Sequence, residues 1–383
     1  MATMGEVERR ATAVADGVLA ATADEIDRDG SFPKAAVDGL REAGLMAALI
    51  PVELGGMGAS MSDVARSITA LGRQCASTAM IFAMHQIQVA CLVRHGSTPE
   101  LLEYLREISA KQLLLASATT EIGIGGDVRT SSCFVERVGD HYKLSKNAPV
   151  ISYGDYADAI LATARRDADA APNDQVIVVC RRDGVTLQRT TEWDALGFRG
   201  TCSHGYMLDA EGPLADVVPV PYGDVSSRTM LPVSHMVWSS VWLGVAEAAV
   251  NKARKYVRSQ ARSKPGVVLP AATRLAELVS VHQQLQGLVL GALARWESAQ
   301  ADPEELEGFG FTIAMNTLKV AASEIVVDVV NRAMQVIGIS AYRMDSQYCL
   351  GRHLRDAHGA ALMVNNDRIT QNNAQLLLVA KES

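Results

Sequence analysis

The sequence lacks four features, and each absence excludes a class of protein. No apolar run reaches the roughly 20 continuous residues that cross a bilayer, so we expect no membrane span. Its six cysteines lie far apart with no C-x-x-C pair, which argues against a disulfide framework or a zinc site and favours reduced thiols in the cytoplasm. Basic residues are not in excess: the sequence has 36 Lys and Arg and 43 Asp and Glu. We therefore expect no nucleic-acid partner. The first ten residues mix acids with bases, which predicts no secretory signal.

The composition is that of a globular protein with a sizeable core. Hydrophobic residues make up 48% of the 383 residues and charged residues 21%. The residue pattern changes twice along the chain, and we therefore expect three domains: an N-terminal helical domain over 1–112, a small β domain over 113–222 and a C-terminal helical bundle over 223–383. The predicted fold class is α+β, with the element order α, then β, then α.

Apolar residues at helical spacing dominate both ends of the chain. In the N-terminal part the glycines of the segment 51–58 interrupt this spacing and predict a tight loop. A later helix there carries Met84, His85 and Gln86. In the C-terminal part the spacing predicts four helices, over 233–262, 271–300, 312–337 and 353–380.

Short strand-like segments recur through the middle of the chain. They cover 113–119, 132–138, 141–144, 159–164, 176–180 and 205–208. A glycine-rich turn with Gly123, Gly125 and Gly126 follows the first of them. Such glycines let backbone N–H groups approach an anionic or carbonyl-rich ligand closely, and the hydroxyls of Thr119 and Thr120 add donors beside them.

Four segments in this order resemble motifs of the acyl-CoA dehydrogenase family, and together they span nearly the whole chain. Residues 50–58 (IPVELGGMG) are similar to its P-x-x-x-G-G-x-G loop, and residues 120–127 (TEIGIGGD) to its flavin-binding T-E-x-x-x-G-S-D turn. Residues 196–201 (LGFRGT) match an L-G-x-R-G-[ST] hairpin. Residues 335–338 (QVIG) and 355–357 (RDA) match its Q-x-x-G and R-D-A pair. The resemblance implies a helical N-terminal domain, a central β domain and a C-terminal four-helix bundle.

The resemblance also implies a flavin cofactor and assigns residues to it. Thr120 corresponds to a residue that bonds the isoalloxazine edge, with Thr119, Gly125 and Gly126 beside it. Ser152 corresponds to the hydroxyl near the flavin's reactive nitrogen, whereas Val150 replaces the tryptophan that usually covers the ring.

A second set of residues is implied to bind the cofactor of a neighbouring subunit. Arg262 and Gln335, with Gly338 closing the same motif, resemble residues that reach the FAD phosphates of that neighbour, which predicts a homodimer or homotetramer. The family's R-x-x-F-G segment reads RSKPG at 262–266 in this chain, so FMN stays open as an alternative to FAD.

The resemblance leaves the catalytic base unassigned. Dehydrogenation of an acyl thioester needs a base for the α-proton while the β-hydrogen leaves as hydride. The family's usual glutamate falls at Val364, and the alternative position falls at Ser234, so neither is a carboxylate. Asp367, three residues after Val364 and on its face if the helix is continuous, is one candidate, and His235 is another. His85 is a third candidate, for which a structural role is favoured over a catalytic one, and the resemblance implies that Glu121 and Glu247 are structural.

Three functions follow from these observations. The first is dehydrogenation of an acyl thioester, carried by CoA or by a carrier protein, with an electron-transfer flavoprotein or oxygen as acceptor. The second is a flavin monooxygenase on the same fold, because such enzymes need no glutamate base, and Val364 and Val150 both fit it. The third is a flavin-free assembly or partner-binding protein. No basic cluster in the sequence clearly marks a nucleotide end of the substrate site.

Overall fold

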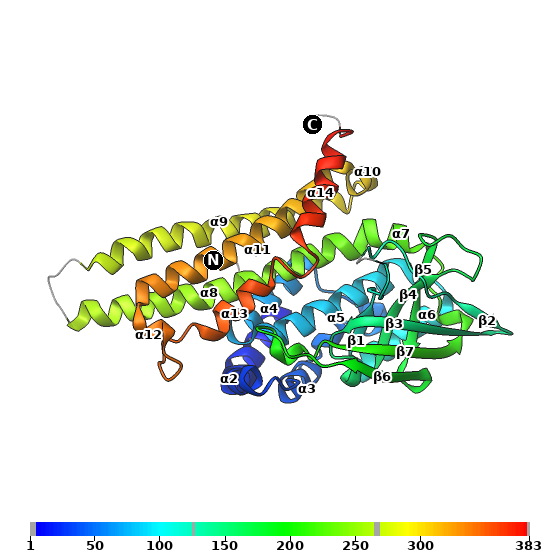
Figure 1. Ribbon diagram of the computed structural model, residues 1–383, viewed down its shortest axis with the longest axis horizontal. Helices are drawn as coiled ribbons and strands as arrows, with labels where there is room; N and C mark the ends of the chain where they lie inside the picture. The colour runs from blue at the N-terminus through cyan, green and yellow to red at the C-terminus, as the bar shows by residue number, and fades with distance from the viewer. Residues whose placement is uncertain (1–4, 125–126, 264–268, 381–383) are drawn as a thin grey trace.

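The N-terminal part of the protein is a group of helices that lies below the long helix α8 (Leu231–Ser263) in the view of Figure 1. The computed structural model describes residues 5–124, 127–263 and 269–380. Its first helices are α1 (Glu6–Val14), α2 (Ala20–Asp29), α3 (Lys34–Glu42), α4 (Met61–Gln74), α5 (Ala76–His95) and α6 (Pro99–Lys111). Ser60 begins α4 with a capping box that includes Asp63, and Thr98 caps α6 ahead of Pro99.

Helix α5 is the central helix of this region. It is long and apolar enough to cross a membrane by length and composition, yet 89% of its most apolar window is buried inside the protein. It packs against α4, the later helix α8 (Leu231–Ser263) and strand β1 (Leu115–Ala118). Its apolarity is therefore explained by a position in the core of the fold.

The middle of the chain forms two small sheets. The first has the order β1-β4-β5, with β4 (Ala159–Arg165) parallel to β1 and antiparallel to β5 (Gln175–Arg181). The second is antiparallel with the order β2-β3-β7-β6, formed by β2 (Glu136–Val138), β3 (His141–Ile151), β7 (His204–Pro213) and β6 (Val185–Thr191). The six predicted strands are confirmed, and β6 is an addition. Its residues are half-buried or exposed, so the alternation that marks a strand is weak there.

The C-terminal part is a helical bundle whose long helices extend away from the sheets (Figure 1). A short helix α7 (Tyr222–Val225) precedes the π-helical turn Ser226–Met230, which leads into α8. Helices α9 (Pro270–Ala299) and α11 (Phe309–Ile337) pack on α8, while α4 and α5 pack on its other side. The chain also forms α10 (Pro303–Glu307), α12 (Ile339–Tyr342), α13 (Gly351–Gly359) and α14 (Asn366–Leu377).

The prediction of one helix over 353–380 is wrong. The structure has two helices there, α13 and α14, separated by residues 360–365. Val364 has a left-handed backbone (φ 46), which does not continue an α-helix, and Asn365 caps α14 by accepting the N–H of Asp367. The three predicted helices before it are confirmed by α8, α9 and α11. With both helical regions and the β region in place, the predicted fold class is also confirmed.

Candidate functional site

The turn after β1 presents two hydroxyls at the edge of the sheets. Thr119 and Thr120 are half-buried, and their hydroxyls have no hydrogen-bond partner among the described residues. The N–H of Ile122 donates to the carbonyl of Asn147 at 2.9 Å, which ties this turn to β3. Gly123 adopts φ 98, a conformation that favours glycine. Gly125 and Gly126, predicted in the same turn, lie outside the described residues.

Glu121 fixes this turn from inside the protein. Its carboxylate accepts the N–H groups of Ser132 (3.1 Å) and Cys133 (2.8 Å). It also pairs with Lys146 of β3 at 3.2 Å, and both side chains are buried. Glu121 therefore acts as a structural residue, and so does Glu247 of α8, which pairs with Arg73 of α4.

Ser152 lies just beyond β3, in a corner built by three separate segments. The next residue, Tyr153, has a left-handed backbone (φ 45) and donates its N–H to Thr201 O (2.8 Å) and its hydroxyl to Leu115 O (2.9 Å). The Ser152 hydroxyl lies 2.8 Å from that of Ser203. The sequence segments 115–122, 150–153 and 196–203 thus meet at one place.

These residues fit the edge of a flavin. An isoalloxazine ring presents both carbonyl oxygens and ring nitrogens, so it needs donors and acceptors side by side. The unpartnered hydroxyls of Thr119 and Thr120 supply donors, and the buried Oδ1 of Asn147, which lacks a partner in the described part of the chain, supplies an acceptor. Val150 is 39% exposed beside Ser152, so an apolar surface is open to the ring there.

His235 of α8 has a buried, neutral imidazole ring, and only one of its two ring nitrogens has a hydrogen-bond partner among the described residues. Its Nδ1 lies 3.1 Å from the carbonyl oxygen of Met315 of α11, so Nδ1 carries the proton. Nε2 is left with a lone pair that has no partner among the described residues. Burial, with a smaller contribution from the charge of Lys319, lowers the pKa of His235 to about 4, which keeps the ring neutral near pH 7.

Lys319 of α11 binds the segment that contains Val364, the position of the family's usual glutamate. Its ammonium donates to the carbonyl of Val364 (2.7 Å) and to Oδ1 of Asn366 (2.7 Å). Burial lowers the pKa of Lys319 to about 8. Met315 and Lys319 are four residues apart, about one helical turn, so His235 and the Val364 segment approach the same part of α11. His235 and the Val364 segment therefore contact α11 within about one helical turn of each other.

The first two candidate bases differ in exposure, because His235 is buried. Asp367 is exposed in the first turn of α14. The expectation that it shares a helical face with Val364 is wrong, because Val364 precedes the helix and is left-handed. His85 receives the N–H of Leu115 at Nδ1 (3.0 Å), and its Nε2 lies 2.8 Å from Met46 O, so both of its nitrogens are used structurally.

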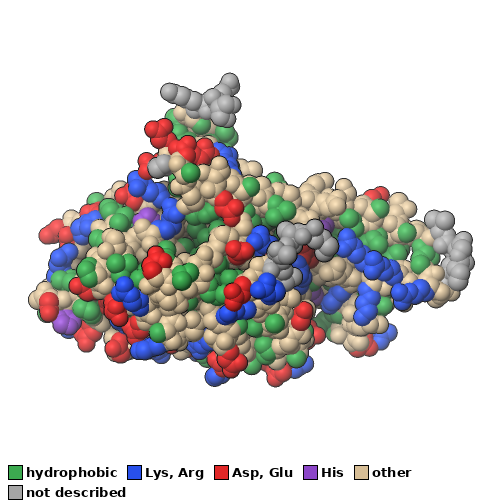
Figure 2. Space-filling model, turned by 180° about the vertical axis from the view of Figure 1, so that it is seen from behind, with side chains coloured by type: hydrophobic (Ala, Val, Ile, Leu, Met, Phe, Trp, Pro, Cys, Tyr) green, Lys and Arg blue, Asp and Glu red, His purple; other side chains and the backbone are tan. Residues whose placement is uncertain are grey.

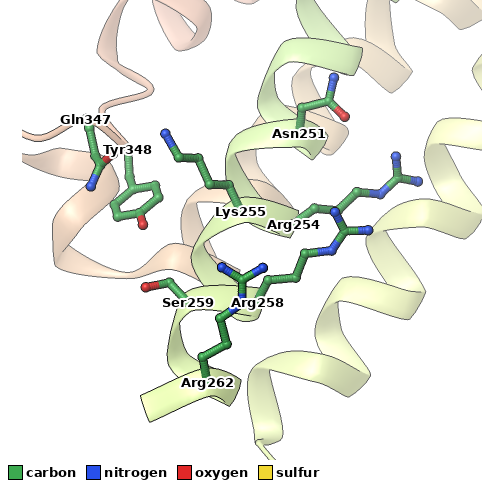
Figure 3. Close-up of a pocket in the computed structure, with 8 residues that line it drawn as sticks. All are labelled: Asn251, Arg254, Lys255, Arg258, Ser259, Arg262, Gln347 and Tyr348. Carbon is green, nitrogen blue, oxygen red and sulfur yellow. The ribbon is translucent and has the colours of Figure 1, made fainter.

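A groove lined by cations lies at the far end of α8. Figure 3 shows Arg254, Arg258 and Arg262 on successive turns of the helix and Lys255 next to Arg254. Gln347 and Tyr348 lie across from them, in the segment after α12. The groove has a volume of about 530 Å³. None of the four cations has an acidic partner in the described ranges. From behind, blue side chains gather on the part of the bundle that extends away from the β region (Figure 2).

The groove is a basic cluster that the sequence analysis did not identify, and Arg262 is the only one of its four cations that was named there. The spacing of Arg254, Arg258 and Arg262 at four-residue intervals was the signal for it, because it places three guanidinium groups on one helical face. Of the other residues predicted to reach a neighbour's cofactor, Gln335 is exposed in the last turn of α11 and Gly338 (φ 73) ends that helix. Among the described residues that line the groove, neither Gln335 nor Gly338 is present.

The comparisons with known proteins agree with this architecture. The model of the acyl-CoA dehydrogenase N-terminal domain matches residues 4–112, and that of the C-terminal domain matches residues 225–364. The cyclohex-1-ene-1-carbonyl-CoA dehydrogenase of Syntrophus aciditrophicus is 26% identical over 92% of this chain and 84% of its own. A protein of Pseudomonas putida named "Probable FMNH2-dependent monooxygenase SfnC" is 27% identical over 89% of this chain and 87% of its own.

A solved structure shares the fold at lower sequence identity. The crystal structure of FMN-bound TdsC from Paenibacillus sp. A11-2 superposes with a TM-score of 0.84 and 22% identity, covering 99% of this chain and 98% of that one. The two family models together cover both helical regions, on either side of the sheets that carry Thr120 and Ser152. The chain belongs to the acyl-CoA dehydrogenase family, and it is an oxidoreductase built on that family's fold.

Proposed function

We propose that this protein is a flavin-dependent dehydrogenase that introduces an α,β double bond into an acyl thioester. The observation that carries this proposal is the arrangement around His235. A buried, neutral imidazole with a free Nε2 lone pair lies close to the segment in which the family resemblance places a base. The flavin would accept hydride, and Thr119, Thr120 and Ser152 are the residues that would hold its ring.

In this proposal His235 takes the α-proton of the substrate at Nε2. A bound flavin would supply the acceptor for the β-hydrogen, which would leave as hydride, and the two electrons of the broken α C–H bond would form the new double bond. Because Nδ1–H donates to Met315 O, the ring keeps its orientation, and the positive charge formed on protonation is stabilised by that carbonyl. Asp367 is the second candidate base, and it needs a substrate that reaches the exposed first turn of α14.

We propose FAD as the flavin and a homo-oligomer as the working assembly. The groove of Arg254, Arg258 and Arg262 suits the pyrophosphate of a dinucleotide, since guanidinium groups pair well with phosphates. Residues Ile339, Tyr342 and Met344 are more than 70% exposed near the end of the bundle, which supports a contact with a second copy there. FMN remains the alternative, because a mononucleotide has no pyrophosphate for this groove to bind. The six free cysteines, five of them buried, support a reducing compartment such as the cytoplasm.

The first experiment is anaerobic. Flavin-loaded protein is mixed with acyl-CoA thioesters of short, branched and long chains, and with the same acyl groups on a carrier protein, while the oxidised flavin band is followed. Bleaching by any member supports dehydrogenation, and comparison of the CoA and carrier forms identifies the carrier. An electron-transfer flavoprotein or oxygen is then added to find the acceptor that restores the band.

The variants His235→Gln and Asp367→Asn locate the base. Loss of a positioned general base lowers the rate of bleaching by roughly 10²–10⁴-fold. We expect this loss for His235→Gln and little change for Asp367→Asn. Exposed His358→Gln serves as the matched control, because this residue lies at the end of α13 and has an accessible side chain. An intact rate in His235→Gln together with a large loss in Asp367→Asn would move the base to Asp367.

A flavin monooxygenase is the second candidate, and one observation favours it. Neither base position holds a carboxylate, since Val364 and Ser234 occupy them. The Ser234 hydroxyl donates to Met230 O in the π-helical turn that precedes α8. The similarity to one protein named "Probable FMNH2-dependent monooxygenase SfnC" and to the dibenzothiophene monooxygenase TdsC points the same way. This candidate predicts no bleaching by any thioester, and incorporation of labelled oxygen into an aromatic or sulfur substrate when a reductase supplies reduced flavin. A protein with no affinity for flavin would instead indicate a binding or assembly role.

A further inference from the structure

Three hydroxyl groups form a chain that begins at Ser152 and ends at a backbone carbonyl. The Ser152 and Ser203 hydroxyls lie 2.8 Å apart, and Ser203 and Thr201 are also 2.8 Å apart. Thr201 donates to the carbonyl oxygen of Phe198 at 2.8 Å. Thr201 and Ser203 are buried, whereas Ser152 is half-buried and forms the open end of the chain.

The carbonyl at the closed end decides the direction of the hydrogen bonds. A carbonyl oxygen can only accept a hydrogen bond, so the Thr201 hydroxyl must be the donor in its bond to Phe198 O. Ser203 must then donate to Thr201, and Ser152 must donate to Ser203. In this direction the Ser152 oxygen presents only lone pairs to the open side, and it can accept a hydrogen bond from whatever lies there.

The reverse direction is also possible, at the loss of one hydrogen bond. Phe198 O receives two further donors, Trp193 Nε1–H (3.1 Å) and the backbone N–H of Thr201 (3.0 Å), so it is not left unpaired when the Thr201 hydroxyl turns away. Thr201 then donates to Ser203, Ser203 to Ser152, and Ser152 to the open side. The two directions differ by the single bond between Thr201 and Phe198 O.

We propose that Ser203 and Thr201 are positioning residues that bias the flavin toward its reduced form through Ser152. This inference rests on the proposed function, in which Ser152 holds the flavin ring, and on the family resemblance, which places the Ser152 hydroxyl near the reactive nitrogen of the ring. In a bound flavin that nitrogen would be a hydrogen-bond acceptor in the oxidised ring, and it would become a donor once it had taken up hydride from the β-carbon of the substrate. The favoured direction of the hydroxyl chain accepts from the reduced form. The oxidised form requires the reverse direction, which has one hydrogen bond fewer.

The test measures the midpoint potential of bound FAD, anaerobically and against a dye of known potential. One neutral hydrogen bond corresponds to about a fivefold change in the ratio of reduced to oxidised flavin, or roughly 20 mV for a two-electron couple. We expect Ser203→Ala and Thr201→Val each to lower the potential by this amount. The double variant should shift it no further, because both changes interrupt the same chain.

Controls separate this effect from local damage. Cys202→Ala changes the residue between the two positions, whose thiol contacts Gly30 O and not the hydroxyl chain, and should leave the potential unchanged. Ser203→Thr and Thr201→Ser keep the hydroxyls and should restore the wild-type value. Potentials unchanged in both interrupting variants, or shifts that add in the double variant, would overturn the inference. A fluorescence titration in which the wild-type protein binds no FAD would overturn the proposed function instead.

Discussion

The ammonium of Lys319 on α11 donates a hydrogen bond of 2.7 Å to the carbonyl oxygen of Val364, a residue with a left-handed backbone. That conformation costs a β-branched residue about 1–2 kcal/mol, so the surrounding structure must hold it in place. Lys319 does so from a buried position, and its second bond to Asn366 fixes the start of α14. The same lysine therefore sets the shape of the segment between α13 and α14, which belongs to the candidate site.

The first prediction concerns this lysine. Lys319→Met keeps the apolar stem but removes both hydrogen bonds and leaves the Val364 carbonyl without its donor. We expect the free energy of unfolding to fall by about 2–3 kcal/mol, measured by urea denaturation. Lys255→Met, an exposed position on α8, is the control and should stay within about 0.5 kcal/mol of wild type. Equal stability of the two variants would contradict the role of Lys319.

The second prediction is a pH dependence caused by His235. Its pKa is about 4 in the folded protein and 6.5 as a free side chain, so the unfolded chain binds the proton more tightly. Stability therefore decreases as pH falls from 6.5 toward 4. The contribution amounts to about 2 kcal/mol between pH 7 and pH 5. We expect His235→Gln to lose stability less steeply over this interval than wild type, and exposed His358→Gln to follow wild type. Parallel slopes for all three proteins would argue against a buried neutral imidazole.

The third prediction concerns the buried pair of Glu121 and Lys146. Glu121→Gln leaves the Lys146 ammonium without a carboxylate in a buried position, and removal of one partner of such a pair costs about 3–5 kcal/mol. Because Glu121 also receives the N–H groups of residues 132 and 133, we expect the turn after β1 to loosen and flavin affinity to fall. Urea denaturation and a flavin titration measure the two effects. Glu136→Gln on the exposed strand β2 is the control, and a matching loss in that variant would show that the effect is not specific to the pair.

The fourth prediction distinguishes FAD from FMN. Arg258→Glu reverses one charge in the groove on α8 and should weaken the binding of a dinucleotide that reaches it. We expect at least a tenfold loss of FAD affinity, corresponding to about 1.4 kcal/mol, with FMN affinity unchanged. Arg137→Glu on β2 reverses the charge of another exposed arginine and controls for net charge. If FMN and FAD affinities fall together, the groove does not serve the adenylate half of the cofactor.

Sequence reasoning predicted the order of the elements well because most of its signals are local. The spacing of apolar residues indicated α8, α9 and α11, and alternating or continuous apolar runs indicated six strands. The strand β6 was missed because Gln188, Arg189 and Thr190 are exposed and leave little alternation to detect. The break before α14 was missed although Asn365 and Asn366 are typical of a helix start, because helical spacing around it suggested continuity.

The candidate site was harder to predict, because its decisive contacts join distant segments. Nothing near His235 in the sequence indicates that Met315, 80 residues later, orients its ring. The partnership of Ser152 with Ser203 spans 51 residues and depends on how β3 and β7 pair. Ser152 was predicted only because the family resemblance marked it, whereas the glycine-rich turn also indicated Thr120. The spacing of the groove arginines was visible in the sequence and was overlooked.

Helix α8 carries His235 near its start and Arg262 near its end, about 40 Å apart at 1.5 Å per residue. In the proposed assembly, one end of this helix serves the chain's own reaction and the other serves the cofactor of a neighbouring copy. A change near His235 then affects the chain's own site, whereas a change near Arg262 affects the site of a neighbouring copy. Two inactive variants, one altered at Ser152 and one at Arg258, would complement each other when mixed, because some mixed oligomers contain a site that inherits neither change.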